Sequence, residues 1–243
     1  MATVAADRWG SKIGGLLAAL PSTTLFALFF LAWTQTPAFA ARATLVMPMV
    51  LASENLFLLS YIALAKRGIS IALTTALATW VVTALTLSYF RFENLMAGLI
   101  TYIVLFLLVY YLVEYVLHVP SSTGKRIYYT PKTILLRGLI SGTVIGFAVV
   151  MGKIGGPLVG GMFSAFPAMF TSTILITYFS RGAAFSAAIM KSAILGLMTI
   201  MVHALMVRVT YVPLGIWWGT AVSTLVSFST GYLIYHVGIK KLR

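Results

Sequence analysis

Two stretches decide the fold: GGLLAALP at residues 14–21 and GGMFSAFP at residues 160–167. Each contains two adjacent glycines, an alanine and a proline at the same spacing, and the two stretches lie 146 residues apart. The same offset aligns PAFAA at residues 37–41 with AAFSA at residues 183–187. A repeated local sequence indicates a repeated structural unit. We therefore predict that the chain contains two copies of one unit.

The composition indicates a protein that lies in lipid. Of the 243 residues, 60% are hydrophobic and only 9% are charged, and the mean hydropathy is +1.01. Soluble domains contain about 45–50% apolar and about 25% charged residues. The composition therefore excludes a soluble enzyme, a disordered protein and a fibrous repeat. Since one crossing takes about 20 apolar residues, we predict an all-α polytopic transmembrane helix bundle of about eight spans, a single membrane domain over residues 1–243.

The order of the spans determines how the two copies are related. The predicted spans are residues 13–33, 41–65, 69–89, 95–117, 134–151, 158–179, 183–207 and 214–237. The offset of 146 places spans 1–3, in repeat unit A (12–90), over spans 6–8, in repeat unit B (157–238), with linker helices over 95–152. Equivalent helices are five spans apart, an odd number, so they cross in opposite directions. This is an inverted-topology repeat of three-helix units, a common construction of secondary transporters.

The basic residues predict the orientation. With eight spans, twelve Lys and Arg residues lie on the side of both termini and four on the other. Basic loops stay in the cytoplasm, so we expect a multi-pass protein of the cell (inner) membrane with both termini cytoplasmic. An alternative is that Arg8, Lys12 and the apolar run before residues 38–40 form a cleaved signal peptide. The apolar run of 21 residues is long for such a peptide, which favours a retained span.

The prolines of the repeated stretches predict discontinuous helices. Proline removes a backbone hydrogen bond from a helix, and lipid does not satisfy the freed carbonyl. Pro21 and Pro167 lie ~12 and ~14 Å from the ends of their spans at 1.5 Å per residue, near the middle of a core about 30 Å thick. Helix N-termini there would favour an anionic group; the alternative is two mild kinks with close glycine packing. The predicted helix-break residues are Gly14, Gly15, Pro21, Gly160, Gly161 and Pro167, and the hydroxyl residues predicted to bind a solute beside them are Ser22, Thr23, Thr171 and Ser172.

Two charged residues, Glu54 and Lys191, fall near the middle of the predicted spans. Counted along their helices, Glu54 lies ~20 Å from the outer face and Lys191 ~12 Å from the inner face, which gives nearly equal heights. An ionisable residue at mid-membrane is a candidate functional residue. We predict a Glu54–Lys191 pair with Asn55 beside it, for one partner of which a substrate or proton competes. The alternative is a permanent ion pair that sets helix register.

Other residues exclude several classes of function. The chain has no cysteine, and no loop carries a cluster of His, Asp and Glu, a nucleophile motif or a phosphate-binding loop. We therefore expect no enzyme, no catalytic residue and no cofactor. Methionines around His203 would suit a soft metal, but methionine also fills gaps in packing, and we predict no metal site. No basic run exceeds two residues, which argues against nucleic acid, and the basic loop 118–133 suggests contact with anionic lipid.

The glycine–proline openings and the Ala-Phe-(Ala/Ser)-Ala stretches, within residues 12–60 and 155–205, resemble small prokaryotic membrane proteins of the GlpM-like type. This resemblance implies no substrate. In principle the broken-helix repeat is also similar to amino-acid and sodium symporters, although three helices per unit differ from their five, and no sodium-site residue carries over. We expect a secondary transporter of a small solute, with an anionic one favoured, that works by alternating access. A channel for ions or small solutes is the alternative, followed by a membrane scaffold that transports nothing; a homo-oligomer remains open.

Overall fold

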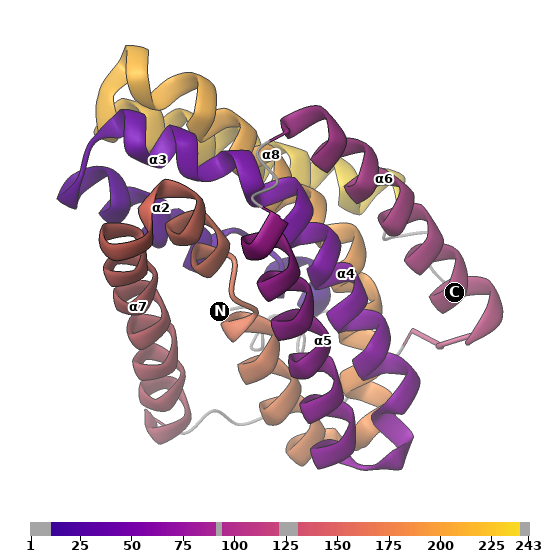
Figure 1. Ribbon diagram of the computed structural model, residues 1–243. Coiled ribbons are helices and arrows are strands. Elements are labelled where there is room, and N and C mark those ends of the chain that lie inside the picture. The colour runs from indigo at the N-terminus through magenta and orange to yellow at the C-terminus, as the bar shows by residue number, and fades with distance from the viewer. Residues whose placement is uncertain (1–10, 91–93, 122–130, 239–243) are drawn as a thin grey trace.

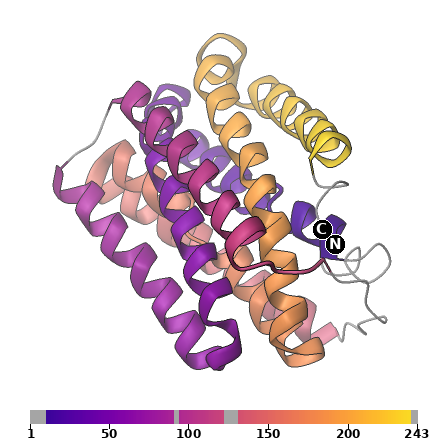
Figure 2. The same cartoon turned by 90° about the vertical axis from the view of Figure 1, so that its right-hand side faces the viewer.

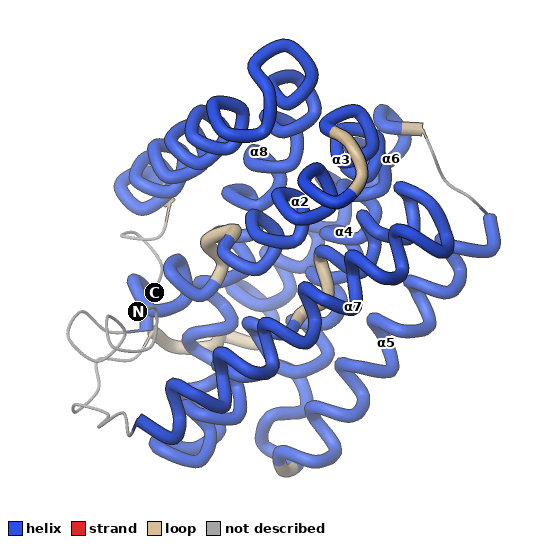
Figure 3. The backbone as a smooth tube through the Cα atoms, turned by 90° about the vertical axis from the view of Figure 1, so that its left-hand side faces the viewer, coloured by secondary structure: helices blue, strands red, loops and turns tan. Residues whose placement is uncertain are grey.

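The computed structural model describes residues 11–90, 94–121 and 131–238 (Figure 1). The described residues form helices joined by short turns and contain no strand (Figure 3). A helix over residues 11–18 comes first. The elements that follow are α2 (Ser22–Thr34), α3 (Pro37–Ala43), η1 (Thr44–Val46), α4 (Met47–Leu64), η2 (Ala65–Arg67), α5 (Ile69–Phe90), α6 (Leu95–Tyr111), the π-helical turn η3 (Leu112–Val116), α7 (Pro131–Ser164) and α8 (Ala168–Val237). The predicted all-α class is confirmed.

Glycine turns divide the two longest helices. The 70 residues of α8 would extend ~105 Å at 1.5 Å per residue, but the chain turns at Gly182 (φ 82°) and Gly215 (φ 73°). Glycine adopts a positive φ without steric cost, so these residues allow the chain to fold back on itself. A third such turn, at Gly156, divides α7. With these boundaries the described helical segments are residues 11–34, 37–67, 69–90, 95–116, 131–155, 157–181, 183–214 and 216–237.

The segment boundaries follow the predicted spans closely, with one clear difference. Residues 208–213, which the sequence places in a loop, are helical and extend the segment that begins at Ala183. Only the turn at Gly215 ends this segment, because Pro213 lies inside the helix without interrupting it. Several helices are long and apolar enough to cross a membrane, among them Pro37–Arg67 and Leu95–Val116. The hydropathy and length of these helices support a membrane protein.

Helix α4 lies at the centre of the bundle. It packs against α5, α6 and α8 (Figures 1 and 2), and most of its side chains are buried. Helices α5 and α6 instead expose apolar side chains such as Val82, Leu85, Ile100 and Val104. Because large exposed apolar faces suit lipid rather than water, the outer helices shield α4 from the bilayer. Most side chains of α4 therefore lie inside the bundle.

Candidate functional site

Two helices are interrupted at positions that differ by 146 residues. The helix over 11–18 stops before Pro21, and α7 stops before Pro167. The two prolines have nearly the same conformation, with φ −73° and ψ 38° at Pro21 and φ −73° and ψ 42° at Pro167. The N–H of Ser22 donates to the Leu20 carbonyl at 2.7 Å, and the N–H of Ala168 donates to the Phe166 carbonyl, also at 2.7 Å. The two breaks therefore have the same backbone structure.

Hydroxyl groups from other segments bind the carbonyls next to the breaks. In a continuous helix the Ala168 N–H would bond the carbonyl of Ser164. That carbonyl instead accepts the hydroxyl of Thr24 at 3.3 Å, so a side chain beside the first break satisfies a backbone group at the second. The carbonyl of Ala19 accepts the hydroxyl of Thr199 at 2.8 Å. Such partners make irregular backbone tolerable inside a membrane protein.

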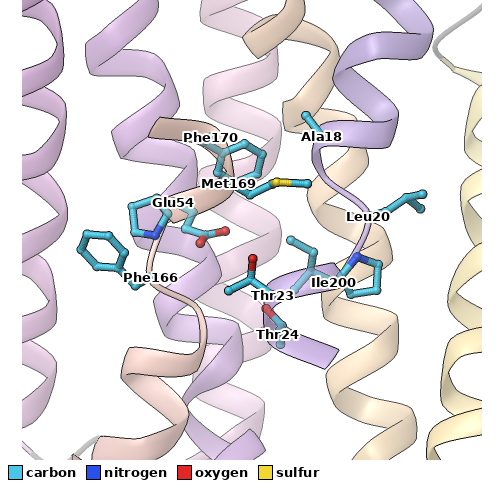
Figure 4. Close-up of a pocket in the computed structure, with 11 residues that line it drawn as sticks. Ala18, Leu20, Thr23, Thr24, Glu54, Phe166, Met169, Phe170 and Ile200 are labelled. Carbon is cyan, nitrogen blue, oxygen red and sulfur yellow. The ribbon is translucent and has the colours of Figure 1, made fainter. Parts of the chain in front are cut away.

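A cavity lies between the two breaks, and the carboxylate of Glu54 points into it (Figure 4). Its volume is about 20 Å³, enough for about one water molecule. Glu54 comes from α4 and is only 3% exposed. Within the described part of the chain, its Oε2 atom has no hydrogen-bond partner. The lining residues are Ala18, Leu20, Pro21, Thr23, Thr24, Glu54, Phe166, Pro167, Met169, Phe170 and Ile200.

Most residues that line this cavity form pairs 146 positions apart in the sequence. Apart from Ala18, every lining residue has its equivalent in the lining at an offset of 146: Leu20 with Phe166, Pro21 with Pro167, Thr23 with Met169, Thr24 with Phe170, and Glu54 with Ile200. The chemistry of the two sides differs. Repeat unit A contributes the hydroxyls and the carboxylate, whereas repeat unit B contributes only apolar side chains at the equivalent positions. The cavity is therefore symmetric in position and asymmetric in polarity.

The glycines of the repeated stretches make reciprocal contacts between the two units. A Cβ atom on Gly15 would overlap the carbonyl oxygen of Ile189, and one on Gly161 would overlap that of Ala43. Residues 15 and 161 are equivalent at the offset of 146, and so are residues 43 and 189. The 146-residue offset therefore exchanges one contact with the other, as a two-fold axis exchanges a pair of contacts.

These glycines do not break the helices, although we expected them to belong to the breaks. Residues 14, 15, 160 and 161 are all helical, and the interruption comes only at residues 19–21 and 165–167. Proline interrupts the helix because it lacks the N–H that the preceding turn requires. The glycines instead allow two backbones to approach closely, which is the role of small residues at membrane helix contacts.

The two broken segments run in opposite directions where they pack. Leu31, late in the first segment, lies against Gly160, early in the segment 157–181. Thr24, earlier in the first segment, contacts Ser164, which comes later in its own segment. Contacts that come later along the first segment therefore fall earlier along the second, so the two segments pack antiparallel at these residues.

Lys191 pairs with Glu114 rather than with Glu54. Its Nζ atom lies 2.6 Å from Oε2 of Glu114, in η3, and also donates to the carbonyl of Val119 at 2.6 Å. The side chains of Lys191 and Glu114 are 3% and 7% exposed. The sequence prediction measured depth along one straight α-helix from Ala41, but the 3₁₀ turn η1 lies between Ala41 and Glu54 and divides α3 from α4. The repeat equivalent of Glu54 is Ile200, nine residues beyond Lys191.

The remaining predicted site residues lie in different surroundings. Asn55 is buried and donates to the carbonyl of Leu51 at 3.0 Å, and it does not line the cavity. Ser172 donates to the Met169 carbonyl at 3.0 Å, and Thr171 also lies outside the lining. Ser22 lines a neighbouring crevice instead. Of the hydroxyl and ionisable residues predicted as binding groups, the structure brings only Thr23 and Glu54 together at the cavity.

Sequence reasoning missed the apolar side of the cavity. Met169, Phe170 and Ile200 carry no polar group that would mark them as site residues. The offset of 146, applied to Thr23, Thr24 and Glu54, leads to these three positions. The 146-residue offset could therefore have identified these three positions, whereas their residue types could not.

The described residues contain no group of three or more His, Cys, Asp or Glu side chains that could hold a metal ion. Most of the predicted lipid-binding loop, residues 122–130 of 118–133, lies outside the described residues. In comparisons with known proteins, no family model, curated protein or solved structure matches the chain.

Proposed function

We propose that this chain is a secondary membrane transporter that binds a proton or a small cation at Glu54 and works by alternating access between two inverted repeats. One observation carries the proposal: both broken helices meet at a single cavity, and the buried carboxylate of Glu54, whose Oε2 atom has no hydrogen-bond partner among the described residues, points into it. Inverted-repeat transporters bind substrate or coupling ion at discontinuous helices near mid-membrane. An ionisable side chain at that depth marks an ion pathway.

The electrostatics favour a positive occupant. A carboxylate taken out of water without a partner is costly, and a bound proton or cation removes that cost. The first turns of α2 and α8 line the same cavity, and helix N-termini favour negative charge nearby. These two N-termini stabilise the negative charge of the Glu54 carboxylate. That carboxylate occupies the place that the sequence suggested for an anionic solute. A second negative charge would be repelled, so a cation or proton replaces the anion in the proposal.

The size of the cavity limits what this conformation holds at Glu54. A volume of about 20 Å³ accommodates one water molecule, a proton or a small cation without its full hydration shell. Larger occupants need a rearrangement or a neighbouring space. In the proposal, the eight helical segments are eight crossings, the termini are cytoplasmic, and one unit rocks against the other around Glu54.

Flux measurements test the proposal. Purified protein in proteoliposomes should move protons or Na⁺ at a rate that saturates and responds to a counter-gradient. Glu54→Gln, which keeps the size but removes the charge, should lower this flux at least tenfold, and Glu54→Asp should retain part of it. Glu93→Gln removes a carboxyl elsewhere in the chain and should leave the flux unchanged.

Two outcomes would contradict the carrier. Unsaturated, high conductance would indicate a channel, and no flux of either ion in folded protein would favour a scaffold. Equal flux of Glu54→Gln and wild-type protein would remove Glu54 from the mechanism.

A further inference from the structure

A second, larger cavity adjoins the one at Glu54. This crevice has a volume of about 280 Å³, near the lower end of the range for small-molecule sites. It lies between α2, the first half of α7 and the start of α8. Its lining residues are Ser22, Thr23, Phe26, Gly138, Ser141, Ile145 and Met169. Thr23 and Met169 line both cavities, so the crevice and the cavity meet at these two residues.

The two cavities have complementary chemistry. The described residues wall the crevice mainly with apolar side chains, and their polar groups are neutral hydroxyls such as that of Ser141. Among the described residues that line the two cavities, Glu54 is the one with a charge. The combined space is therefore apolar at its wide end and anionic at its narrow end. A few placed polar groups in an otherwise apolar pocket are typical of sites for small organic molecules.

We propose that the crevice and the cavity form one site for an organic cation with an apolar body. The cationic group lies at Glu54, and the body occupies the crevice against Phe26, Ile145 and Met169. This proposal rests on the proposed function, because it uses Glu54 as the cation-binding group, and it adds the class of substrate. A bare inorganic ion would gain nothing from apolar walls, whereas an organic ammonium buries its hydrocarbon there.

Met169 lies at the boundary between the two spaces. Figure 4 shows its side chain beside the carboxylate of Glu54, and it lines the crevice as well. Methionine is unbranched and adapts its shape to its neighbours. Thr23 lines both spaces as well, so these two side chains form the boundary between the crevice and the carboxylate.

Three probes of matched shape test the site. Cyclohexylammonium, cyclohexanol and cyclohexanecarboxylate share a ring and differ in charge. Calorimetric titration of the purified protein in lipid nanodiscs should show cyclohexylammonium binding at least tenfold more tightly than cyclohexanol, with the carboxylate weakest. In Glu54→Gln the amine should lose this preference over the alcohol.

Two glycines of α7 give a matched pair of variants. A Cβ atom on Gly138 or on Gly142 would meet no described atom within 4 Å, so both positions accept a Cβ atom without overlap. Only Gly138 lines the crevice. Gly138→Leu should weaken cyclohexylammonium binding at least tenfold, and Gly142→Leu should leave it unchanged.

Equal binding of the three probes, or an equal effect of Gly138→Leu and Gly142→Leu, would overturn the bipartite site. Proton or Na⁺ flux that still depends on Glu54 would then leave the proposed function standing. Conversely, charge-selective binding that Gly138→Leu weakens, in protein without flux, would support the site and contradict the transporter.

Discussion

Two ionisable side chains lie inside the bundle in opposite circumstances. The Nζ atom of Lys191 lies 2.6 Å from Oε2 of Glu114 and donates a hydrogen bond to the carbonyl of Val119. Glu54 faces a cavity, and its Oε2 has no hydrogen-bond partner among the described residues. A buried ion pair with hydrogen bonds suits a fixed structural role, whereas a carboxylate at a cavity is available to an occupant. The two residues that the sequence joined in one site are therefore assigned different roles.

The structural role of Lys191 predicts a loss of stability on substitution. Lys191→Met leaves Glu114 without this cation in a buried position, which typically costs about 3–5 kcal/mol. Adding Glu114→Gln removes the second charge as well and should restore part of the loss. Unfolding of the purified variants in mixed detergent micelles measures both effects.

The exposed Lys66 provides the control, because Lys66→Met should change the unfolding free energy by less than about 0.5 kcal/mol. If Lys191→Met folded with wild-type stability and yet abolished flux, Lys191 would belong to the transport site after all.

At the scale of elements, close helix contacts hold the two units together. Gly15 packs against the backbone of residue 189, and Gly161 packs against the backbone of residue 43. The broken helix of each unit thus rests on the second helical segment of the other. Any rocking of one unit against the other has to preserve these contacts or pivot about them.

Adding one methyl group tests these contacts. Gly15→Ala and Gly161→Ala each introduce a Cβ atom that overlaps a backbone carbonyl, so each should lower the unfolding free energy by about 1–3 kcal/mol. The reciprocal geometry predicts losses of similar size at both positions. Gly142→Ala, where a Cβ atom meets nothing within 4 Å, should be neutral or slightly stabilising because alanine favours a helix. Thermal unfolding of the three variants would contradict the reciprocal contact if only one of the first two were destabilised.

At the scale of the whole molecule, local features recur at the offset of 146 residues. Besides the breaks and the glycine contacts, the hydroxyl of Thr34 bonds the carbonyl of Phe30, and the hydroxyl of Ser180 bonds that of Ile176. Both bonds join residues four apart, and the two pairs are equivalent at the offset of 146. Thr34 and Ser180 are exposed near the ends of their segments. An inverted repeat would place them on opposite sides of the membrane.

Labelling of single cysteines tests the inversion, and the chain contains no native cysteine to interfere. We expect Thr34→Cys to react with a membrane-impermeant maleimide in right-side-out vesicles only, and Ser180→Cys in inside-out vesicles only. Reaction of both variants from the same side would show that the two units run in parallel, which would contradict alternating access between inverted repeats.

Much of the architecture could be predicted from local sequence. Long apolar runs ending at turn residues place most helix boundaries, because each helix in lipid satisfies its own backbone. Pro21 and Pro167 predict the interruptions for an equally local reason, the missing N–H. The helix over 208–213 could not be predicted in this way, because its polar and basic residues resemble a loop.

Local sequence accounts for the apolar helices, the proline interruptions and the similarity of stretches 146 residues apart. These features follow from interactions between residues a few positions apart, or from direct comparison of the two copies. Long-range packing brings Lys191 to Glu114, turns Glu54 toward the two breaks and leaves a crevice beside it. Such contacts depend on the turn before α4 and on the packing of distant segments. Counting residues along a straight helix gives approximate depth but not the direction in which a side chain points.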